Sequence, residues 1–204
     1  MLIGAGGHAK VVVATARSAG FEVVGLYDDN PTLHGSSLLG VPVLGGITDI
    51  DPETAESFML AIGDNGTRRK LGNQLSHLPW ATIIHQQAMV HESVRLSPGS
   101  IVFAGAVIQP EAEIGAHVIV NTGASVDHDC QIGDFAHLAP GVRLAGGIRV
   151  GDGAFVGMGS CVIPGKCIGA WSVVGAGTVI TKDIHDRVLA FGVPARIQRV
   201  LEDK

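Results

Sequence analysis

Residues 120–137 read VNTGASVDHDCQIGDFAH and contain the side chains best suited to moving a proton. His128 lies between Asp127 and Asp129, and His137 follows nine positions later. An imidazole with a pKa of about 6.5 can accept a proton at neutral pH, and an adjacent carboxylate can orient the ring and stabilise its charged form. His128 is therefore a candidate general base. The alternative is that these polar residues have no catalytic role and are solvent-exposed side chains on an elongated structural domain.

The stretch lies within a six-residue repeat. Every sixth residue from Ile84 to Ile180 is Ile, Leu or Val, at seventeen successive positions. If these types made up about a third of the chain, chance would satisfy this register roughly once in 10⁸ trials, so the pattern is a hexapeptide repeat.

Two further positions of each hexad are restricted in residue type. Position five is mostly small or β-branched, which predicts a second inward side chain in a narrow interior; examples are Ala106, Ala124, Cys130, Ala136, Ala154, Ser160 and Thr178. Glycine often occupies position two, where we expect corners with unusual φ values. These glycines are Gly115, Gly133, Gly151, Gly157, Gly169 and Gly175.

Hexads this regular resemble the left-handed parallel β-helix of hexapeptide acyltransferases. In that fold three hexads form one triangular coil, so the seventeen hexads imply between five and six coils, with residues eighteen apart stacked. No insertion interrupts the hexads, so we expect no loop protruding from the coils. The active site must then be built on the coil faces or completed by another part of the protein.

The first 80 residues break the repeat and indicate a small α/β unit. A short apolar run leads into the glycine-rich turn GAGGHA, a helix-like segment follows, and the strand-like residues 22–27 end at Asp28 and Asp29. In a Rossmann-type unit, such glycines let a phosphate approach a helix N-terminus, and such an acid holds a ribose or sugar hydroxyl. The unit is too short for a full dinucleotide domain, which favours one nucleotide or nucleotide-sugar as its ligand.

The fold class predicted is an α/β Rossmann-like nucleotide-sugar domain followed by an all-β left-handed parallel β-helix. We expect the first domain at 1–80, the second at 81–185 and a C-terminal tail at 186–204. Within the first domain, FMLAIGDNGTRRKLGNQL predicts a strand, a turn and a helix that begins near Thr67.

Six segments together carry a more specific resemblance: GAGGHAKVV, YDDNP, AIGDN, NTGASVDHDCQIGDFAHLAPG, LAGGIRVG and FGVPARIQRV. They resemble the sialic-acid O-acetyltransferase-like family of bacterial nucleotide-sugar acetyltransferases, which includes UDP-4-amino-sugar and GDP-perosamine N-acetyltransferases. The resemblance covers essentially the whole chain. It implies acetyl-CoA as donor, a nucleotide-sugar held by the N-terminal domain, and a homotrimer with CoA between neighbouring β-helices, serving bacterial glycan synthesis.

The same resemblance assigns roles to individual residues. It implies that His128 is the general base, that Asp129 steers its ring, that His137 lies near the acetyl group and that the Gly146 N–H polarises the thioester carbonyl. Gly146 follows His128 by eighteen residues, hence one coil along on the same face. A base and a fixed N–H suit this chemistry, since the attacking amine must lose a proton and the oxyanion needs a donor. The implied substrate-binding residues are Gly6, Gly7, His8, Lys10, Asp28, Asp29, Asp64 and Asn65.

Composition argues against several other classes of partner. The net charge is −5 and no Lys/Arg block is present, which disfavours nucleic acid and acidic membrane surfaces. Cys130, Cys161 and Cys167 form no Cys-x-x-Cys pair, which disfavours a disulfide framework or a zinc ribbon and fits a reducing cytoplasm. No signal-peptide pattern or apolar run of roughly 18 residues is present, so we expect a soluble cytoplasmic protein. We also expect that it needs no metal.

Three classes of function are compatible with these features. The first is acetyl transfer to a UDP-, dTDP- or GDP-linked sugar, at a 4-amino nitrogen or, alternatively, at a hydroxyl oxygen. The second is a zinc hydro-lyase, since carbonic anhydrases use the same helix with three histidine ligands, although His117, His128 and His137 lack their short His-x4-His spacing. The third is a non-catalytic nucleotide-binding or scaffold subunit whose β-helix only trimerises.

Overall fold

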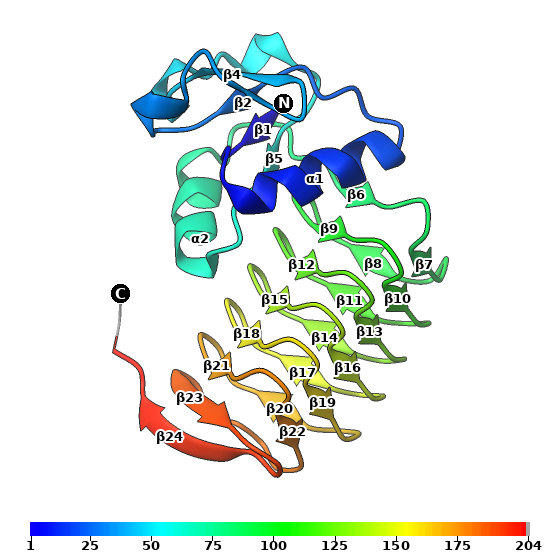
Figure 1. Cartoon of the computed structure of the whole chain (residues 1–204). Helices are drawn as coiled ribbons and strands as arrows, with labels where there is room; N and C mark the ends of the chain where they lie inside the picture. The colour runs from blue at the N-terminus through cyan, green and yellow to red at the C-terminus, as the bar shows by residue number, and fades with distance from the viewer. Residues whose placement is uncertain (203–204) are drawn as a thin grey trace.

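The computed structural model describes residues 1–202 as a small α/β unit placed on one end of a column of flat coils (Figure 1). The last two residues of the expected C-terminal tail, 203–204, lie outside the described residues. The N-terminal unit contains β1 (Leu2–Ile3), α1 (Gly7–Ser18), β2 (Leu26–Tyr27), β3 (Ser37–Leu38), β4 (Val41–Gly45), β5 (Met59–Leu60) and α2 (Asn65–Gln74), with 3₁₀ turns at Pro31–Leu33, Ile47–Asp49 and Pro52–Thr54.

The sheet of this unit has the strand order β3-β4-β2-β1-β5, with β4, β2, β1 and β5 parallel and β3 antiparallel at one edge. This confirms the predicted Rossmann-like unit. Helix α1 packs between the sheet and the first coils, because its buried side chains share one apolar cluster with both. That cluster includes Ala9, Val12, Val13 and Ala16 of α1 and Ile83, Ile101 and Ile119 of the coils.

Two element boundaries differ from those expected. The strand predicted over residues 22–27 is regular only at Leu26–Tyr27. Helix α2 begins at Asn65, before the expected Thr67, because the Asp64 side chain caps it: Asp64 Oδ1 accepts hydrogen bonds from the Thr67 N–H at 2.8 Å and the Thr67 hydroxyl at 2.7 Å.

The coils are built from two-residue strands that recur every six residues. They are β6 (Ile83–Ile84), β7 (Met89–Val90), β8 (Arg95–Leu96), β9 (Ile101–Val102), β10 (Val107–Ile108), β11 (Glu113–Ile114), β12 (Ile119–Val120), β13 (Ser125–Val126), β14 (Gln131–Ile132), β15 (His137–Leu138), β16 (Arg143–Leu144), β17 (Arg149–Val150), β18 (Phe155–Val156), β19 (Cys161–Val162), β20 (Cys167–Ile168), β21 (Val173–Val174) and β22 (Val179–Ile180). A hairpin of β23 (Val188–Phe191) and β24 (Arg196–Val200) ends the column.

Every third strand pairs in parallel, so the column has three faces. Face 1 runs from β6 through β9, β12, β15, β18 and β21 to the β23–β24 hairpin. Face 2 contains β7, β10, β13, β16, β19 and β22, and face 3 contains β8, β11, β14, β17 and β20. The pairing of β12 with β15 joins Val120 to Leu138, which confirms the expected eighteen-residue stacking. The even strand spacing also confirms that no loop interrupts the coils.

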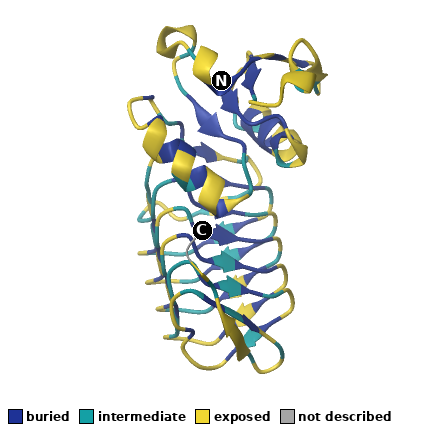
Figure 2. Ribbon diagram, turned by 90° about the vertical axis from the view of Figure 1, so that its left-hand side faces the viewer, coloured by how far each residue is buried: buried dark blue, intermediate teal, exposed yellow. Residues whose placement is uncertain are grey.

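The interior of the column follows the hexad pattern (Figure 2). Repeat positions such as Ile108, Val126 and Val156 are fully buried, and so are most position-five residues, Cys130 included. Ile84 is 37% exposed because it lies in the first coil, at the end of the stack. The two inward positions thus form one continuous apolar core.

The expectation that the position-two glycines have unusual φ values is wrong. Positive φ falls at position four instead, as at Asp129 and Phe135, while the position-two glycines are absent from the positive-φ residues. Position two needs glycine because it lies against the next coil: a Cβ on Gly133 would sit 2.6 Å from the Asp152 nitrogen. Close approach of two backbones, not a special dihedral angle, selects these glycines.

A buried arginine joins the N-terminal unit to the coils. Arg68 of α2 is 1% exposed and donates to six carbonyl oxygens at 2.6 to 3.3 Å. On the N-terminal side these are the backbone oxygens of Ile62 and Gly63 and Oδ1 of Asn65; on the coil side they are the backbone oxygens of His117, Phe135 and Ala136. Burial lowers the pKa of Arg68 to about 10, so the guanidinium stays charged at neutral pH.

Helix α2 also packs along the coil corner between faces 3 and 1. Residues eighteen apart stack there, and the His117 and Phe135 rings lie parallel with centroids 5.0 Å apart. Gly72 faces this pair, since a Cβ there would come within 2.9 Å of Phe135. Two coils further on, the Arg69 guanidinium lies 4.0 Å from the Trp171 ring centre. The helix therefore contacts several coils at once.

Within residues 1–202, neither helix has the length and apolar character needed to cross a bilayer.

We expect Arg68→Met to loosen the junction. The substitution leaves buried carbonyl oxygens without donors, which should cost on the order of 3 kcal/mol or more in the free energy of unfolding. Urea unfolding measures the loss, and hydrogen exchange should show α2 opening before the coils. Arg17→Met is the matched control, because Arg17 is exposed and makes one hydrogen bond, to the Leu39 carbonyl. Equal stability of the two variants would contradict the role assigned to Arg68.

Candidate active site

His128 lies at the corner between β13 and β14, where the chain turns from face 2 to face 3. Its Nδ1 is 2.7 Å from Asp129 Oδ2, and its backbone N–H donates to Asp127 Oδ1 at 2.8 Å. Asp129 occupies the left-handed corner position with φ +58°. When Nδ1–H donates to Asp129, the lone pair is on Nε2, which is the arrangement a general base requires.

The local charges favour the protonated ring. The hydrogen bond with Asp129 raises the pKa of His128 above its usual value; slight desolvation opposes this, and the charges of Asp127 and Asp129 add to it. The side chain is solvent-exposed, at 61% of its maximum. His128 is thus a somewhat stronger base than a free imidazole, and it loses its accepting form as the pH falls through the raised pKa.

Gly146 lies directly beneath the His128 ring. The Gly147 N–H donates to the His128 carbonyl at 2.9 Å, which fixes this coil register. A Cβ built on Gly146 would lie 2.6 Å from both Cε1 and Nε2 of His128. The missing side chain at Gly146 therefore leaves the space in which the imidazole lies, and it brings the main chain of that coil to the edge of the ring.

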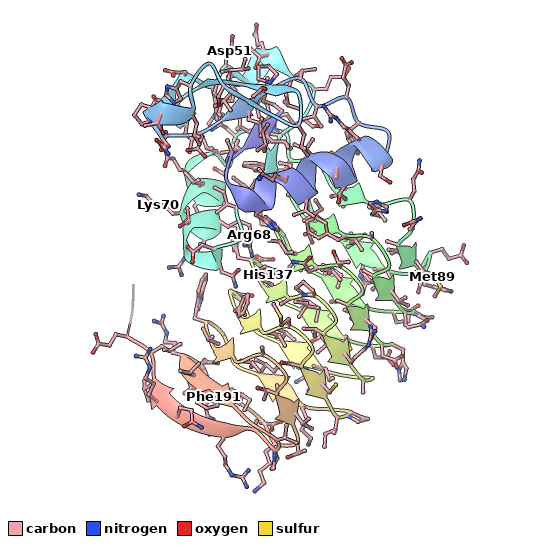
Figure 3. The ribbon with its side chains drawn as sticks, in the orientation of Figure 1. Asp51, Arg68, Lys70, Met89, His137 and Phe191 are labelled. Atoms are coloured by element: carbon pink, nitrogen blue, oxygen red, sulfur yellow. The ribbon has the colours of Figure 1, made fainter. Side chains whose placement is uncertain are left out.

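The second histidine of the motif is on another face. His137 belongs to β15 on face 1 and lies beside Arg68 at the junction with the N-terminal unit (Figure 3). Its Nδ1 is 3.3 Å from the Gly63 carbonyl oxygen, and its Nε2 is 3.0 Å from Asn121 Nδ2. Burial, reinforced by the charge of Arg68, lowers the pKa of His137 to about 3, so the ring is neutral. Within one chain the structure does not bring His137 to the His128 corner.

The glycine-rich turn has the openness that a phosphate needs. A Cβ on Gly6 or Gly7 would meet nothing within 4 Å, and no side chain caps the start of α1. His8, in the first turn of α1, has its ring centroid 6.2 Å from that of His137, and its Nε2 is buried without a hydrogen-bond partner. Lys10 is exposed on the same helix. The turn therefore leads from open space toward His137.

The predicted acidic and amide ligands already make structural contacts. Both Asp28 oxygens accept backbone N–H groups, from Ala5 at 2.7 Å and Asn30 at 2.9 Å. Asp29 accepts one, from Ile47 at 2.8 Å. Each carboxylate thus holds a loop in place. The second carboxylate oxygen of Asp29 takes no part in the hydrogen bond with Ile47.

Asn65 is buried at the junction, which differs from the expected role in binding substrate. Its Nδ2 donates to the carbonyls of Gly153 and Ala154 at 3.0 and 3.2 Å, while its Oδ1 accepts from Arg68. Both ends of the amide are therefore used in attaching α2 to the coils. Asp64, the neighbouring candidate, caps the helix.

A groove lies between α2 and the C-terminal hairpin, and it was not predicted from the sequence. It has a volume of about 1390 Å³, and its floor is formed by Phe155, Val173 and Leu189 on face 1. Gly63, Asp64 and Asn65 line its end near the N-terminal unit. The lining also includes four basic residues, Arg69, Lys70, Arg187 and Arg199.

The three histidines of the zinc alternative lie in separate places. His117 is packed between Phe135 and Trp80, with ring centroids 5.0 and 4.8 Å away, and burial lowers its pKa to about 4. His128 is exposed at its corner, and His137 is buried on face 1. Among residues 1–202, no three His, Cys, Asp or Glu side chains converge as a metal site would require.

Two residues at the junction, Arg68 and Asn121, were not predicted from the sequence, although the sequence contains an indication of each. Arg68 occupies the helical register of Leu71 and Leu75, both buried, so a charge was present on the apolar side of α2. Asn121 precedes His137 by sixteen residues, close to one coil, within the motif itself. The sequence contains both features, a cation on the buried side of a helix and an amide about one coil before a histidine. They can be recognised only when the buried side of the helix and the register of the coils are known.

Comparison with known proteins gives matches along most of the chain. Residues 1–75 match the family model described as the PglD N-terminal domain. Perosamine N-acetyltransferase from Caulobacter crescentus, solved in complex with CoA and GDP-perosamine, is 45% identical, with 97% of this chain and 96% of that one covered and a TM-score of 0.92. Variants of that enzyme with one histidine replaced by asparagine or alanine have been solved with the same two ligands.

The acetyltransferase domain of PglB from Neisseria gonorrhoeae, solved with acetyl coenzyme A, is 35% identical over 97% of both chains, with a TM-score of 0.91. GDP-perosamine N-acetyltransferase of Escherichia coli O157:H7 is 30% identical over 94 residues, 45% of this chain. The match spans less than half of the length of the curated relatives: 42% of the E. coli protein and 24% of an uncharacterised mimivirus protein.

We expect Gly146→Ala to displace the His128 ring and leave the fold intact. Gly146 is not among the positive-φ residues, so alanine is tolerated by the backbone, but its Cβ would overlap the imidazole. Loss of the contact with Asp129 should bring the pKa of His128 down toward its usual value, measured by NMR titration. Gly66→Ala is the control, because its Cβ would come no closer than 3.5 Å to Asp64. An unchanged titration of His128 in Gly146→Ala would refute this account of the site.

Proposed function

Because the chain belongs to the family of hexapeptide-repeat nucleotide-sugar N-acetyltransferases, we propose that it transfers the acetyl group of acetyl-CoA to the 4-amino group of a nucleotide-linked sugar. The observation that carries the proposal is the 45% identity, along 97% of the chain, to an enzyme solved with CoA and GDP-perosamine. A GDP-linked 4-amino sugar is the first candidate acceptor, and UDP-linked 4-amino sugars are the next.

His128 acts as the general base in this proposal. The neutral sugar amine attacks the thioester carbon, a C–N bond forms, and the nitrogen then carries a proton that it must lose. His128 Nε2 accepts this proton, while Asp129 orients the ring and stabilises its charged form. Collapse of the tetrahedral intermediate breaks the C–S bond, and the leaving CoA thiolate takes up the proton held by His128, which returns the base to its neutral form. No enzyme nucleophile is needed, which agrees with Cys130 being buried in the core.

Gly146 supplies the hydrogen-bond donor that stabilises the oxyanion. We assign its backbone N–H to the thioester oxygen, which becomes negatively charged during the attack. A main-chain donor on a packed coil is fixed before the reaction and does not have to reorganise. Its position against the His128 ring would place the proton acceptor and the oxyanion donor on the two sides of one carbonyl group.

The N-terminal unit holds the acceptor in this proposal. Residues 1–80 bind the nucleotide-sugar and residues 81–185, with the tail at 186–204, bind the donor. Gly6 and Gly7 give the diphosphate access to the start of α1, with His8 and Lys10 beside it, and the second oxygen of Asp29 accepts a ribose or sugar hydroxyl. The acceptor path leads toward face 1, whereas His128 lies at the corner between faces 2 and 3.

This separation supports a shared active site. In a homotrimer with side-by-side coils, the acceptor bound to one copy would meet the His128 corner of the next, and His137 on face 1 would approach the acetyl group from the acceptor side. We place the enzyme in the cytoplasm and in bacterial glycan synthesis, where nucleotide-sugars and acetyl-CoA are both supplied.

The test of the proposed function is release of free thiol from acetyl-CoA with a panel of acceptors. We expect turnover with GDP-perosamine or with UDP- or dTDP-linked 4-amino-4,6-dideoxy sugars, and an acetamide product by mass spectrometry. The 4-hydroxy analogues are the matched controls. Turnover with the hydroxy analogues alone would identify an O-acetyltransferase, and CoA binding without turnover on any acceptor would support a scaffold.

We expect His128→Ala to lower kcat by about 10² to 10⁴, the usual span for a general base. Because the ring must be neutral to accept a proton, wild-type activity should fall as the pH drops through a value above 6.5, the direction in which Asp129 moves the pKa. Asp129→Asn should cost less and move this acidic limb to lower pH. His91→Ala, an exposed coil histidine that contacts Ser93, is the control. Wild-type kcat in a folded His128→Ala protein would rule out the mechanism.

A further inference from the structure

Three of the four polar groups of His128 already have partners. Its backbone N–H donates to Asp127 Oδ1 at 2.8 Å, and its Nδ1 lies 2.7 Å from Asp129 Oδ2. Its carbonyl oxygen accepts the Gly147 N–H of the next coil at 2.9 Å. Within residues 1–202, its Nε2 has no hydrogen-bond partner. The residue is therefore fixed at its main chain and at one side of its ring, and the opposite ring nitrogen is left for a ligand.

The contact with Asp127 acts on the main chain, whereas the contact with Asp129 acts on the ring. His128 lies in an exposed corner, where a backbone N–H without a protein partner would bond to water and leave the corner freer to move. A side-chain oxygen that accepts this N–H holds the backbone of His128, and hence the direction in which its Cβ leaves the coil. The ring thus starts from one direction, within reach of the Asp129 carboxylate.

The neighbouring corner of the same coil makes this type of contact with a neutral side chain. Asn121 precedes Asp127 by six residues, and its Oδ1 accepts the Thr122 N–H at 2.8 Å. Both residues directly follow the repeat position of their hexad, Val120 and Val126. The amide of Asn121 therefore shows that the contact needs an oxygen acceptor and no charge. Replacement of the carboxylate at position 127 by an amide should keep the contact and remove only the charge.

The charge of Asp127 has an effect of its own. The hydrogen bond with Asp129 is the largest cause that raises the pKa of His128; slight desolvation opposes it, and the charge of Asp127 adds to it. The coil before contributes Glu111, eighteen residues before Asp129, and the coil after contributes two uncharged glycines at this corner. Asp127 and Asp129 are thus the charged groups that favour the protonated ring.

We propose that Asp127 is a positioning residue for acetyl transfer: it holds the backbone of His128 so that Nε2 points toward Gly146 of the next coil. A Cβ on Gly146 would lie 2.6 Å from Nε2, so this nitrogen is directed at the main chain assigned to the thioester oxygen. This role rests on the proposed function, in which Nε2 accepts the proton of the amine. Asp127 contacts neither substrate and acts through His128.

Two substitutions of Asp127 separate the contact from the charge. Asp127→Ala removes the hydrogen bond and should lower kcat about three- to tenfold, the size of one net hydrogen bond, with the KM of both substrates little changed. Asp127→Asn keeps an oxygen acceptor and should recover most of this kcat. Its acidic limb should move to lower pH, because a charge that raises the pKa of His128 is gone. Gln109→Ala is the matched control: Gln109 is half-buried, eighteen residues earlier at the same corner, and within the described part of the chain its side chain makes no hydrogen bond.

The ring itself is observed by ¹⁵N NMR, without substrate. In the wild type the neutral His128 ring should carry its proton on Nδ1, beside Asp129. In Asp127→Ala we expect the Nε2–H tautomer to gain population, because the bond with Asp129 that fixes the tautomer is made less often. Asp127→Asn and Gln109→Ala should keep the Nδ1–H form.

Three results would overturn the positioning role. The first is wild-type kcat and a wild-type tautomer in Asp127→Ala. The second is a loss of kcat in Asp127→Asn as large as that in Asp127→Ala, since an amide oxygen can make the contact. The third is reduced activity with an unchanged tautomer, since Asp127 would then not act through the ring. Because the NMR measurement needs no substrate, a chain inactive toward every acceptor would reject the proposed function and leave the effect of Asp127 on His128 testable.

Discussion

A single buried cation determines how the two parts of this protein fit together. All six hydrogen-bond acceptors of Arg68 are carbonyl oxygens, drawn from both sides of the junction, and the charge of Asp64 also favours the protonated guanidinium. The positive charge of Arg68 also changes the pKa values of neighbouring histidines. It lowers the pKa values of His8, His117 and His137, after burial itself, and so favours neutral rings around the junction. Neutral imidazoles can lie beside a bound anion or amine without changing charge when it arrives.

The coils provide rigidity of a different kind. Each coil contacts only its neighbours through short parallel strands, so the stack positions a residue by its number within the eighteen-residue period. The His128 corner shows what this allows. At this corner an exposed imidazole, a carboxylate one residue away and a glycine one coil away are held in fixed relation by the coils themselves.

The hexads predicted the coils well because the structure of the coils depends only on position along the chain. Inward residues recur every six positions, and residues eighteen positions apart stack on one another. The position-two glycines were misread because close approach of two coils and a positive φ both select glycine, and residue type alone does not separate them. The roles of Asn65 and Arg68 were outside the reach of the pattern, since their partners on the coils lie far along the chain, at residues 117 to 154. The groove was missed for the same reason: α2, a coil face and the hairpin meet only in three dimensions.

The junction has a consequence for synthesis of the chain on the ribosome. Arg68 is made long before the carbonyl groups of His117, Phe135 and Ala136 that it needs, the last of them 68 residues later. At about 5–20 residues per second, this gap corresponds to roughly 3–14 s. During that interval the guanidinium must stay hydrated, and α2 has no coil corner to pack against. The N-terminal unit therefore cannot reach its final form as an independent module: Arg68 waits for the third coil, and Asn65 waits for the Gly153 and Ala154 carbonyls of the fourth.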